Sequence, residues 1–144
     1  MTTVNPYLLF NGNCEEAFNH YKKIFKREFL QISKYSDMPA VDNALPIPDD
    51  KKHWIMHVAL PLDNGNIIMG SDRHPTFNNL AFGENCKLSI SVDTKDEANR
   101  LFDGLSLNGS VEMPMEDTFW GDYFGMCTDQ FGVEWMVSFN TSTH

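Results

Sequence analysis

Two histidines carry the first chemical signal in the chain. His53 and His57 have HxxxH spacing, which on a helix would place two imidazoles side by side for a zinc ion. Residues 52–61 instead form two alternating sets, which predicts a strand, and four strand residues span about 13 Å. That separation argues against a shared metal. His57 alone is a candidate for acid/base catalysis or ligand contact, and a structural hydrogen bond is the simpler alternative.

A glutamate and a cysteine near the end of the chain are the next candidates. Glu134 lies in the run VEWMVSF, residues 133–139, whose alternation predicts a strand with one apolar face. Glu134 would share the other face with Met136 and Ser138. There it could act as a general base or accept hydrogen bonds from an amine ligand, and a plain position at a solvent-facing rim is the alternative. Cys127 has no histidine nearby in sequence, which does not favour a catalytic thiol.

Two helices are predicted from apolar residues at helical spacing. The first covers residues 14–26, and Asn13 followed by Glu16 has the spacing of an N-cap. The second begins after Thr94, which forms a capping box with Glu97. Each helix has a single apolar stripe, so each is expected to cover one face of a sheet.

Strands are predicted wherever apolar residues alternate between turn signals. Residues 63–65 and 129–132 are predicted turns, and residues 36–51 and 72–85 are predicted loops. Because proline cannot donate to a ladder, Pro114 places its strand at a sheet edge, and Pro6 is tolerated only near the start of its strand or at an edge. The predicted strands are residues 5–10, 29–35, 52–61, 66–71, 86–92, 110–116 and 133–139.

The two halves of the chain repeat the same order of elements. Each contains a strand, a capped helix, a strand and a hairpin with a glycine in its turn. We therefore predict an α+β fold made of tandem βαβββ modules, in which a curled mixed sheet surrounds a central cleft. The modules would cover about residues 1–72 and 86–140 of a single domain of residues 1–144, with a joining loop at 73–85.

The period of two in each strand assigns a set of side chains to the cleft rather than to the helices. Trp120 adds a large flat surface that could stack on a ligand or seal a dimer. The other residues predicted to face the cleft are Tyr7, Leu9, Ile55, His57, Ile67, Met69, Ser71, Lys87, Ser89, Ser91, Glu134, Met136 and Ser138. Glu112 and Glu116, beside Pro114 on an edge strand, are predicted to be solvated.

Composition excludes several classes of function. A net charge of −9 repels phosphate backbones, so nucleic acid is not an expected partner. The three cysteines form no disulfide framework or CxxC pair, which is typical of a reducing cytoplasm. No apolar run approaches the length of a membrane span, and the first residues show no signal-type pattern. No GxGxxG or P-loop motif occurs, so no nucleotide cofactor is predicted.

Three runs of sequence carry a family resemblance. PYLLFNGNCEEAFNHYKKIF, MHVAL and the ending DTFWGDYFG…DQFGVEWMVS are similar to the PhnB-like branch of the vicinal oxygen chelate superfamily. That superfamily also contains glyoxalase I, ring-cleaving dioxygenases and bleomycin resistance proteins. The resemblance covers nearly the whole chain and implies paired βαβββ modules and a homodimer.

The resemblance also implies where a divalent metal would be held. Enzymes of the superfamily use His or Glu ligands on the first and last strand of each module. Carried over by position, the last-strand ligands fall on Met69 and Met136. The first-strand ligands fall near Asn5 or Tyr7 and near Lys87 or Ser89. Thioether sulfur is a soft ligand that does not suit such cations, so neither a metal site nor another cofactor is predicted.

These observations predict a cytoplasmic, metal-free protein that binds an unidentified small molecule and forms a homodimer. One alternative is an enzyme of the same fold, of the lyase, isomerase or dioxygenase type, with His57 and Glu134 as acid and base. The other alternative is a resistance protein that sequesters a cationic drug, as the resemblance to bleomycin resistance proteins implies.

Overall fold

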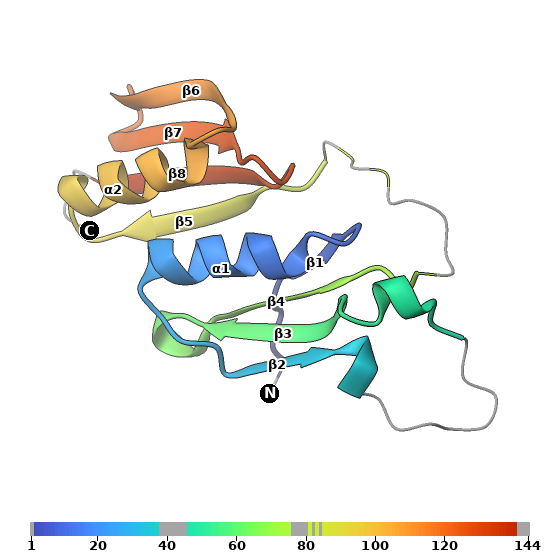
Figure 1. Ribbon diagram of the computed structural model, residues 1–144. Coiled ribbons are helices and arrows are strands. Elements are labelled where there is room, and N and C mark those ends of the chain that lie inside the picture. The colour runs from blue at the N-terminus through green and yellow to red at the C-terminus, as the bar shows by residue number, and fades with distance from the viewer. Residues whose placement is uncertain (1, 38–45, 76–80, 82, 84, 141–144) are drawn as a thin grey trace. The chain divides into compact units, whose positions relative to one another are not determined.

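A computed structural model describes residues 2–37, 46–75, 81, 83 and 85–140 (Figure 1). Residue contacts divide the chain into unit 1, residues 1–81, and unit 2, residues 82–144. Each unit contains one helix and a four-stranded sheet in the order βαβββ, which confirms the predicted α+β fold of repeated modules. Within the predicted loops, residues 38–45, 76–80, 82 and 84 lie outside the described residues.

Unit 1 is a sheet in the order β1-β4-β3-β2, in which β1 runs parallel to β4 and the other neighbours are antiparallel. Single 3₁₀ turns lie at Tyr35–Asp37, Asp49–Lys51 and, between β3 and β4, Asp63–Gly65. The main elements are β1 (Tyr7–Phe10), α1 (Cys14–Phe25), β2 (Gln31–Lys34), β3 (Ile55–Pro61) and β4 (Ile67–Asp72).

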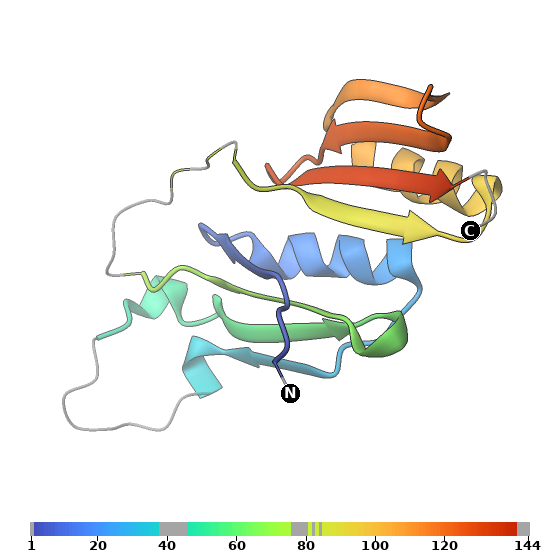
Figure 2. The same cartoon turned by 180° about the vertical axis from the view of Figure 1, so that it is seen from behind.

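Unit 2 repeats this topology with the order β5-β8-β7-β6 and a parallel pair at β5 and β8. In Figure 2 its sheet lies in front of its helix. Pro6 precedes β1 and Pro114 lies in β6, and both are edge strands as predicted. The elements are β5 (Leu88–Val92), α2 (Lys95–Ser106), β6 (Ser110–Asp117), β7 (Asp122–Thr128) and β8 (Glu134–Asn140).

In each unit the helix buries its apolar stripe against one face of the sheet. In unit 1, a Cβ added to Gly70 of β4 would lie 2.6 Å from the ring of Phe18, so only glycine allows α1 to pack this closely. In unit 2, Gly125 of β7 faces the Phe102 ring of α2 in the same way. The buried helix residues are Cys14, Ala17, Phe18, Tyr21 and Ile24 in α1 and Ala98, Leu101, Phe102 and Leu105 in α2.

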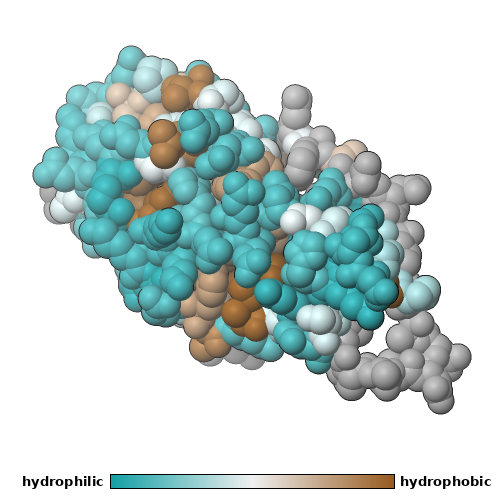
Figure 3. Space-filling view, viewed as in Figure 1, coloured by the Kyte–Doolittle hydropathy of each residue, from teal (hydrophilic) through white to brown (hydrophobic). Residues whose placement is uncertain are grey.

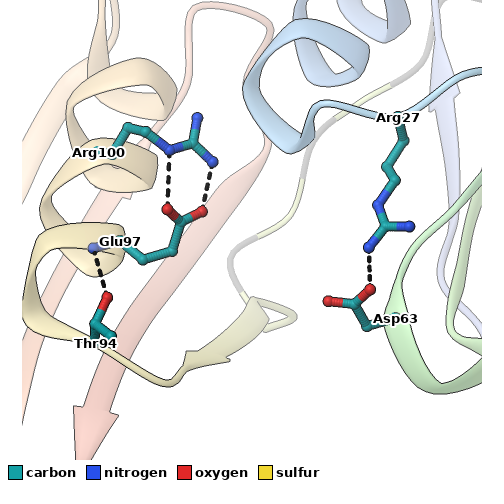
Figure 4. Close-up of polar contacts among 5 residues, drawn as sticks. All are labelled: Arg27, Asp63, Thr94, Glu97 and Arg100. Carbon is teal, nitrogen blue, oxygen red and sulfur yellow. Dashed lines mark hydrogen bonds and ion pairs between the residues drawn. The ribbon is translucent and has the colours of Figure 1, made fainter.

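The two helices begin differently, although their sequences suggest the same device. The Thr94 hydroxyl accepts a hydrogen bond from the Glu97 amide at 3.1 Å, which confirms half of the predicted capping box (Figure 4). The Glu97 carboxylate pairs with Arg100 one turn later. Asn13 occupies the predicted N-cap position, but its side chain makes no cap hydrogen bond.

A buried aspartate at the end of β4 takes the place of that cap. Asp72 is 1% exposed. Its Oδ1 accepts from the amides of Gly12 at 2.7 Å and Cys14 at 3.0 Å, and its Oδ2 accepts from the Ile55 amide at 2.8 Å. The other end of α1 is tied by an ion pair between Arg27 and Asp63 (Figure 4). The first helix is therefore positioned by side chains and backbone groups distant in sequence.

A β-bulge changes the face of one predicted site residue. Ser33 of β2 pairs with His57, but the next residue, Lys34, pairs with Ile55, so Met56 is an extra residue in β3. The bulge interrupts the period of two, and Ile55 is 0% exposed, like Val58 of the same strand. Assignment of Ile55 to the same face as His57 was therefore wrong.

Among the described residues, no helix combines the length and apolar character needed to cross a bilayer.

Candidate functional site

Each sheet has one face that its own helix does not cover, and we call this the helix-free face of the unit. In unit 1, Ile68 and Gly70 of β4 face the helix. The residues of β4 that alternate with them, together with the cross-strand neighbours of those alternate residues, make up the helix-free face. The predicted site residues placed there are Tyr7, Leu9, His57, Ile67, Met69 and Ser71. A cleft shared by the two units stays a prediction.

Tyr7 and His57 form a hydrogen-bonded pair on this face. The Tyr7 hydroxyl lies 3.1 Å from Nδ1 of His57, and the two rings stack with centroids 5.7 Å apart. When the hydroxyl donates, the imidazole proton resides on Nε2, which is then available to a ligand acceptor. The pair joins β1 to β3 across β4, which lies between them.

Hydroxyl groups flank His57 in its cross-strand row. Ser33 pairs directly with His57, and Ser71 of β4 is 7% exposed. The Ser33 Oγ is buried without a hydrogen-bond partner among the described residues. His53, the other member of the HxxxH motif, is exposed and lies before β3 begins. The structure thus places His57 on the helix-free face with Tyr7 and the serines, and leaves His53 outside the sheet.

A charged row crosses the helix-free face of unit 2. Lys87 lies between two carboxylates, with Nζ 3.2 Å from Oε2 of Glu134 and 3.5 Å from Oε2 of Glu112. Thr128 donates its hydroxyl to Oε1 of Glu112. Thr128 is also the cross-strand partner of Glu134. The four side chains form one network, which we call the charged row.

The contacts in the charged row shift the pKa values of Lys87 and Glu112 in opposite directions. The hydrogen bond to Glu134, together with the charges of both carboxylates, raises the pKa of Lys87 above its ordinary value. The hydrogen bond from Thr128, with Lys87 adding to it, lowers the pKa of the Glu112 carboxyl. Both shifts favour the ionised forms of Lys87 and Glu112 near neutral pH.

Beside the charged row lies a row of thioethers. Met113 of β6 pairs with Met126 of β7, and Met126 pairs with Met136 of β8. Ser89 of β5 continues this row as the partner of Met136. Because Gly125 faces α2, its neighbour Met126 points to the helix-free face. We call these three residues the methionine row.

The next row on the same face is mixed. Ser91 of β5 pairs with Ser138 of β8, and their hydroxyl oxygens are 3.5 Å apart. Phe124 of β7 pairs with Ser138. Its ring meets that of Trp120 edge to face, with centroids 5.8 Å apart. Trp120 is half exposed in the turn between β6 and β7, where its indole N–H donates to Asp122 at 3.0 Å.

Sequence reasoning missed several members of these rows. Glu112 is exposed, as predicted, but its contacts with Thr128 and Lys87 were not predicted. A register shift between Val111 and Met113 accounts for this, because it lets consecutive residues of β6 serve the same face. The alternation of residues 122–128 was a signal that could have placed Met126 and Thr128 on that face.

The residues at the expected metal positions do not suit a divalent cation. The register pairs Tyr7 with Met69 and Ser89 with Met136, so the superfamily's ligand positions are adjacent in each sheet. Their donors are a phenol, a hydroxyl and two thioethers, without a carboxylate or an imidazole. Over the described part of the chain, no group of three or more His, Cys, Asp or Glu side chains is arranged to hold a metal.

The cysteines lie apart from both helix-free faces. Cys14 begins α1 and Cys127 lies on the helix-facing side of β7, and both are 0% exposed. Burial raises the pKa of Cys127 to about 11 and also raises the pKa of Cys14. Cys86 is exposed.

Comparison with known sequences gives two matches that span the chain. The family model described as 3-demethylubiquinone-9 3-methyltransferase matches residues 2–138. Protein YjdN from Escherichia coli strain K12 is 34% identical over 140 residues, which cover 94% of this chain and 93% of that protein.

Solved structures show the same architecture. Protein PA1353 from Pseudomonas aeruginosa is 39% identical with a TM-score of 0.85, covering 99% of this chain and 100% of that chain. A putative 3-demethylubiquinone-9 3-methyltransferase, PhnB protein, from Bacillus cereus is 26% identical with a TM-score of 0.76, covering 96% and 99%. A glyoxylase/bleomycin resistance protein/dioxygenase domain from Frankia, 14% identical with a TM-score of 0.68 over 100% and 96%, shares the fold.

Proposed function

Because the chain belongs to the PhnB-like family of the glyoxalase/bleomycin resistance/dioxygenase superfamily, we propose that it binds a small molecule without using a divalent metal. The observation that carries the proposal is the composition of the helix-free faces. They keep organised polar side chains, namely the Tyr7–His57 pair and the charged row, while thioethers occupy the superfamily's carboxylate positions.

The donor chemistry supports the metal-free part of the proposal. A borderline or hard divalent ion gains most of its binding energy from carboxylate, imidazole or thiolate ligands. Met69 and Met136 offer neutral, soft sulfur, and Tyr7 and Ser89 offer hydroxyl oxygens rather than carboxylates. Such a set would leave the cation largely uncompensated.

Elemental analysis of protein purified without added metal or chelator tests this part directly. We expect zinc, manganese, iron and nickel at levels well below one per chain, and thermal unfolding that EDTA does not change. Stoichiometric metal that disappears on substitution of Met136 by Ala would contradict the proposal. The variant Met115→Ala is the matched control, because the Met115 sulfur lies toward the helix-facing Gly125.

The binding part requires a ligand screen. Native mass spectrometry of freshly purified protein would reveal a molecule retained from the cell, and a thermal-shift screen of small organic molecules would find stabilising ligands. We expect stabilisation by at least one class of compound, with amide chemical-shift changes on the helix-free faces. Failure of every compound, with no retained molecule, would remove the proposal.

A second candidate function is acid/base catalysis at His57. The hydrogen bond between the Tyr7 hydroxyl and Nδ1 of His57 favours it, because a fixed tautomer is what a catalytic imidazole needs. Once a converted substrate is known, His57→Ala should abolish turnover, whereas for a binding protein it should only change affinity. Tyr7→Phe removes the hydrogen bond and keeps the ring, so it separates tautomer control from stacking.

Methyl transfer, named in the description of the matched family, is not proposed for this chain. A nucleotide-type methyl donor would be expected to need a glycine-rich loop after a strand, and the sequence lacks that motif. The proposed location is the cytoplasm, supported by three cysteines that are free thiols.

A further inference from the structure

We propose that the helix-free face of unit 2 selects flat, largely apolar molecules that carry one positive charge. This inference rests on the proposed function and adds the chemical class of the ligand. The observations that carry it are the methionine row, the charged row beside it and the spacing between the two.

The methionine row supplies the apolar surface. Met113 is 41% exposed, and Met126 and Met136 are partly buried. Their sulfurs are polarizable, and flexible thioether side chains adapt to the outline of an aromatic ring. Phe124, in the following row, extends this surface toward Trp120. The face therefore offers an aromatic or other flat molecule contact with sulfur and an aromatic edge.

The charged row supplies the preference for positive charge. Lys87 can balance only one of the two carboxylates, so Glu112, Glu134 and Lys87 together have a net charge of −1. Thr128 and Lys87 already engage both oxygens of Glu112. Glu134 has only the Lys87 ion pair among the described contacts, made through Oε2. A cationic group on a ligand would complete the charge balance at Glu134.

The spacing of the two rows fits a small ligand. Glu134 and Met136 are two residues apart on β8, which corresponds to about 6.6 Å along a strand. This is about the distance between an amine and the centre of an aromatic ring that are joined by a short alkyl link. An anionic end group would face Glu134 and Glu112 and would need to displace one of them from Lys87.

Three naphthyl compounds that differ only in their end group test the charge preference. Naphthylmethylamine is cationic at neutral pH, naphthylmethanol is neutral and naphthylacetate is anionic. Affinities from calorimetry should fall in that order, with about a fivefold advantage of the cation over the alcohol, as expected for one partly exposed ion pair. Amide shifts should locate all bound compounds on β7 and β8.

Matched variants assign the preference to Glu134. Glu134→Gln should reduce the advantage of the amine to nearly nothing and leave alcohol binding unchanged. Glu97→Gln removes the same charge from the helix-covered side of unit 2, and it should leave the order of affinities intact. If Glu134→Gln fails to fold, the wild-type advantage of the amine should still shrink as salt is raised, because ionic attraction is screened.

The outcomes separate this inference from the proposed function. Equal affinities for the three compounds, or tightest binding of the acetate, would overturn the charge preference and leave small-molecule binding standing. A preference for the amine that Glu97→Gln abolishes and Glu134→Gln does not would overturn the assignment to this face. Failure of these compounds and of the whole screen would remove the inference together with the proposed function.

Discussion

Asp72 accepts hydrogen bonds from three backbone amides of unit 1. Its carboxylate accepts hydrogen bonds from the amides that open α1 and β3, and Tyr35 donates its hydroxyl to the Asp72 backbone carbonyl at 2.9 Å. The burial of Tyr35, with the nearby charge of Asp72, raises the pKa of the phenol. Asp129 plays a related part in unit 2, where it accepts from Phe131, Val133 and the Trp135 indole.

Replacing Asp72 by Ala should be among the most destabilising single changes in unit 1. It leaves two buried amides and one partly buried amide without acceptors, so we expect a loss of about 3–5 kcal/mol in the free energy of unfolding. Urea denaturation followed by circular dichroism measures this loss. Asp103→Ala on the exposed side of α2 is the control and should change stability by less than about 0.5 kcal/mol. Similar values for the two variants would contradict the role of Asp72.

The three thiols should differ sharply in reactivity. Cys86 is exposed, whereas burial raises the pKa of Cys127 to about 11 and that of Cys14 as well. Since the thiolate is the reactive form, Ellman's reagent near pH 8 should modify one thiol quickly in the native protein and three in denaturant. The variant Cys86→Ser should lose the fast phase. A fast phase of two or three thiols would contradict the buried positions.

Glu112 makes stability depend on pH in a defined direction. Its pKa is lower in the folded protein than in the unfolded chain, so its stabilising contribution is present above the unfolded value. That contribution is lost as pH falls through the folded value. Glu112→Gln should therefore flatten the acid side of the stability curve, measured by thermal unfolding at stepwise lower pH. An unchanged acid limb would show that Glu112 does not interact with Thr128 and Lys87 as described.

The helices show which features of an element its local sequence can predict. Residues 14–25 and 95–106 were placed almost correctly, because apolar spacing follows from one buried face. The caps were not equally predictable. Thr94 has the extended backbone of an N-cap, with φ −139° and ψ 154°, whereas Asn13 has φ −111° and ψ 21°. The partner that replaces Asn13 lies on β4, beyond any local pattern.

Alanine substitution at the two helix starts should reveal this difference. Thr94→Ala removes a cap hydrogen bond and should cost about 1 kcal/mol, whereas Asn13→Ala removes none and should cost only a few tenths. Chemical denaturation of both variants under the same conditions provides the comparison. Equal losses would mean that the Asn13 side chain contributes as a cap in solution.

Bulges explain two errors of strand periodicity, namely the face assigned to Ile55 and the missed contacts of Glu112. One extra residue at Met56 reverses the face of Ile55, and a register shift near Glu112 brings Glu112 beside Lys87. A prediction that assumes strict alternation of faces cannot account for the extra residue of a bulge. It succeeded in β8, where Trp135 and Val137 are buried and Glu134 and Met136 lie on the opposite face.

For the whole molecule, the exposed apolar residues near β6 favour self-association. On the face that Figure 3 shows, most residues are hydrophilic, and the β6 end of unit 2 is one of the places where apolar residues are visible. Phe119 is 98% exposed in the turn after β6, and Val111 and Met113 on β6 are 51% and 41% exposed. Val111 pairs with Cys127 on the helix-facing side and Met113 pairs with Met126 on the helix-free face, so Phe119 is the residue that best marks a contact surface between proteins.

We accordingly predict a homodimer. Analytical ultracentrifugation should give a mass close to twice the chain mass of 16.5 kDa. Phe119→Ser should shift the equilibrium toward the monomer, because it removes an exposed ring that contributes little to the core of unit 2. Asn19→Ser on the exposed side of α1 is a control for an unrelated surface change. A single species of monomer mass at high protein concentration would contradict the prediction.

The dependence of the first helix on Asp72 also fixes the order in which the chain can acquire structure. During synthesis, residues 14–25 leave the ribosome about 47 residues before Asp72, so their first turn lacks its acceptor for several seconds at ordinary elongation rates. Residues 95–106 directly follow their N-cap residue, Thr94, so α2 can form its capped first turn as soon as it is synthesised. The first turn of α1 in nascent unit 1 therefore lacks its acceptor until β4 has been synthesised. During this interval the incompletely folded unit is open to chaperone binding.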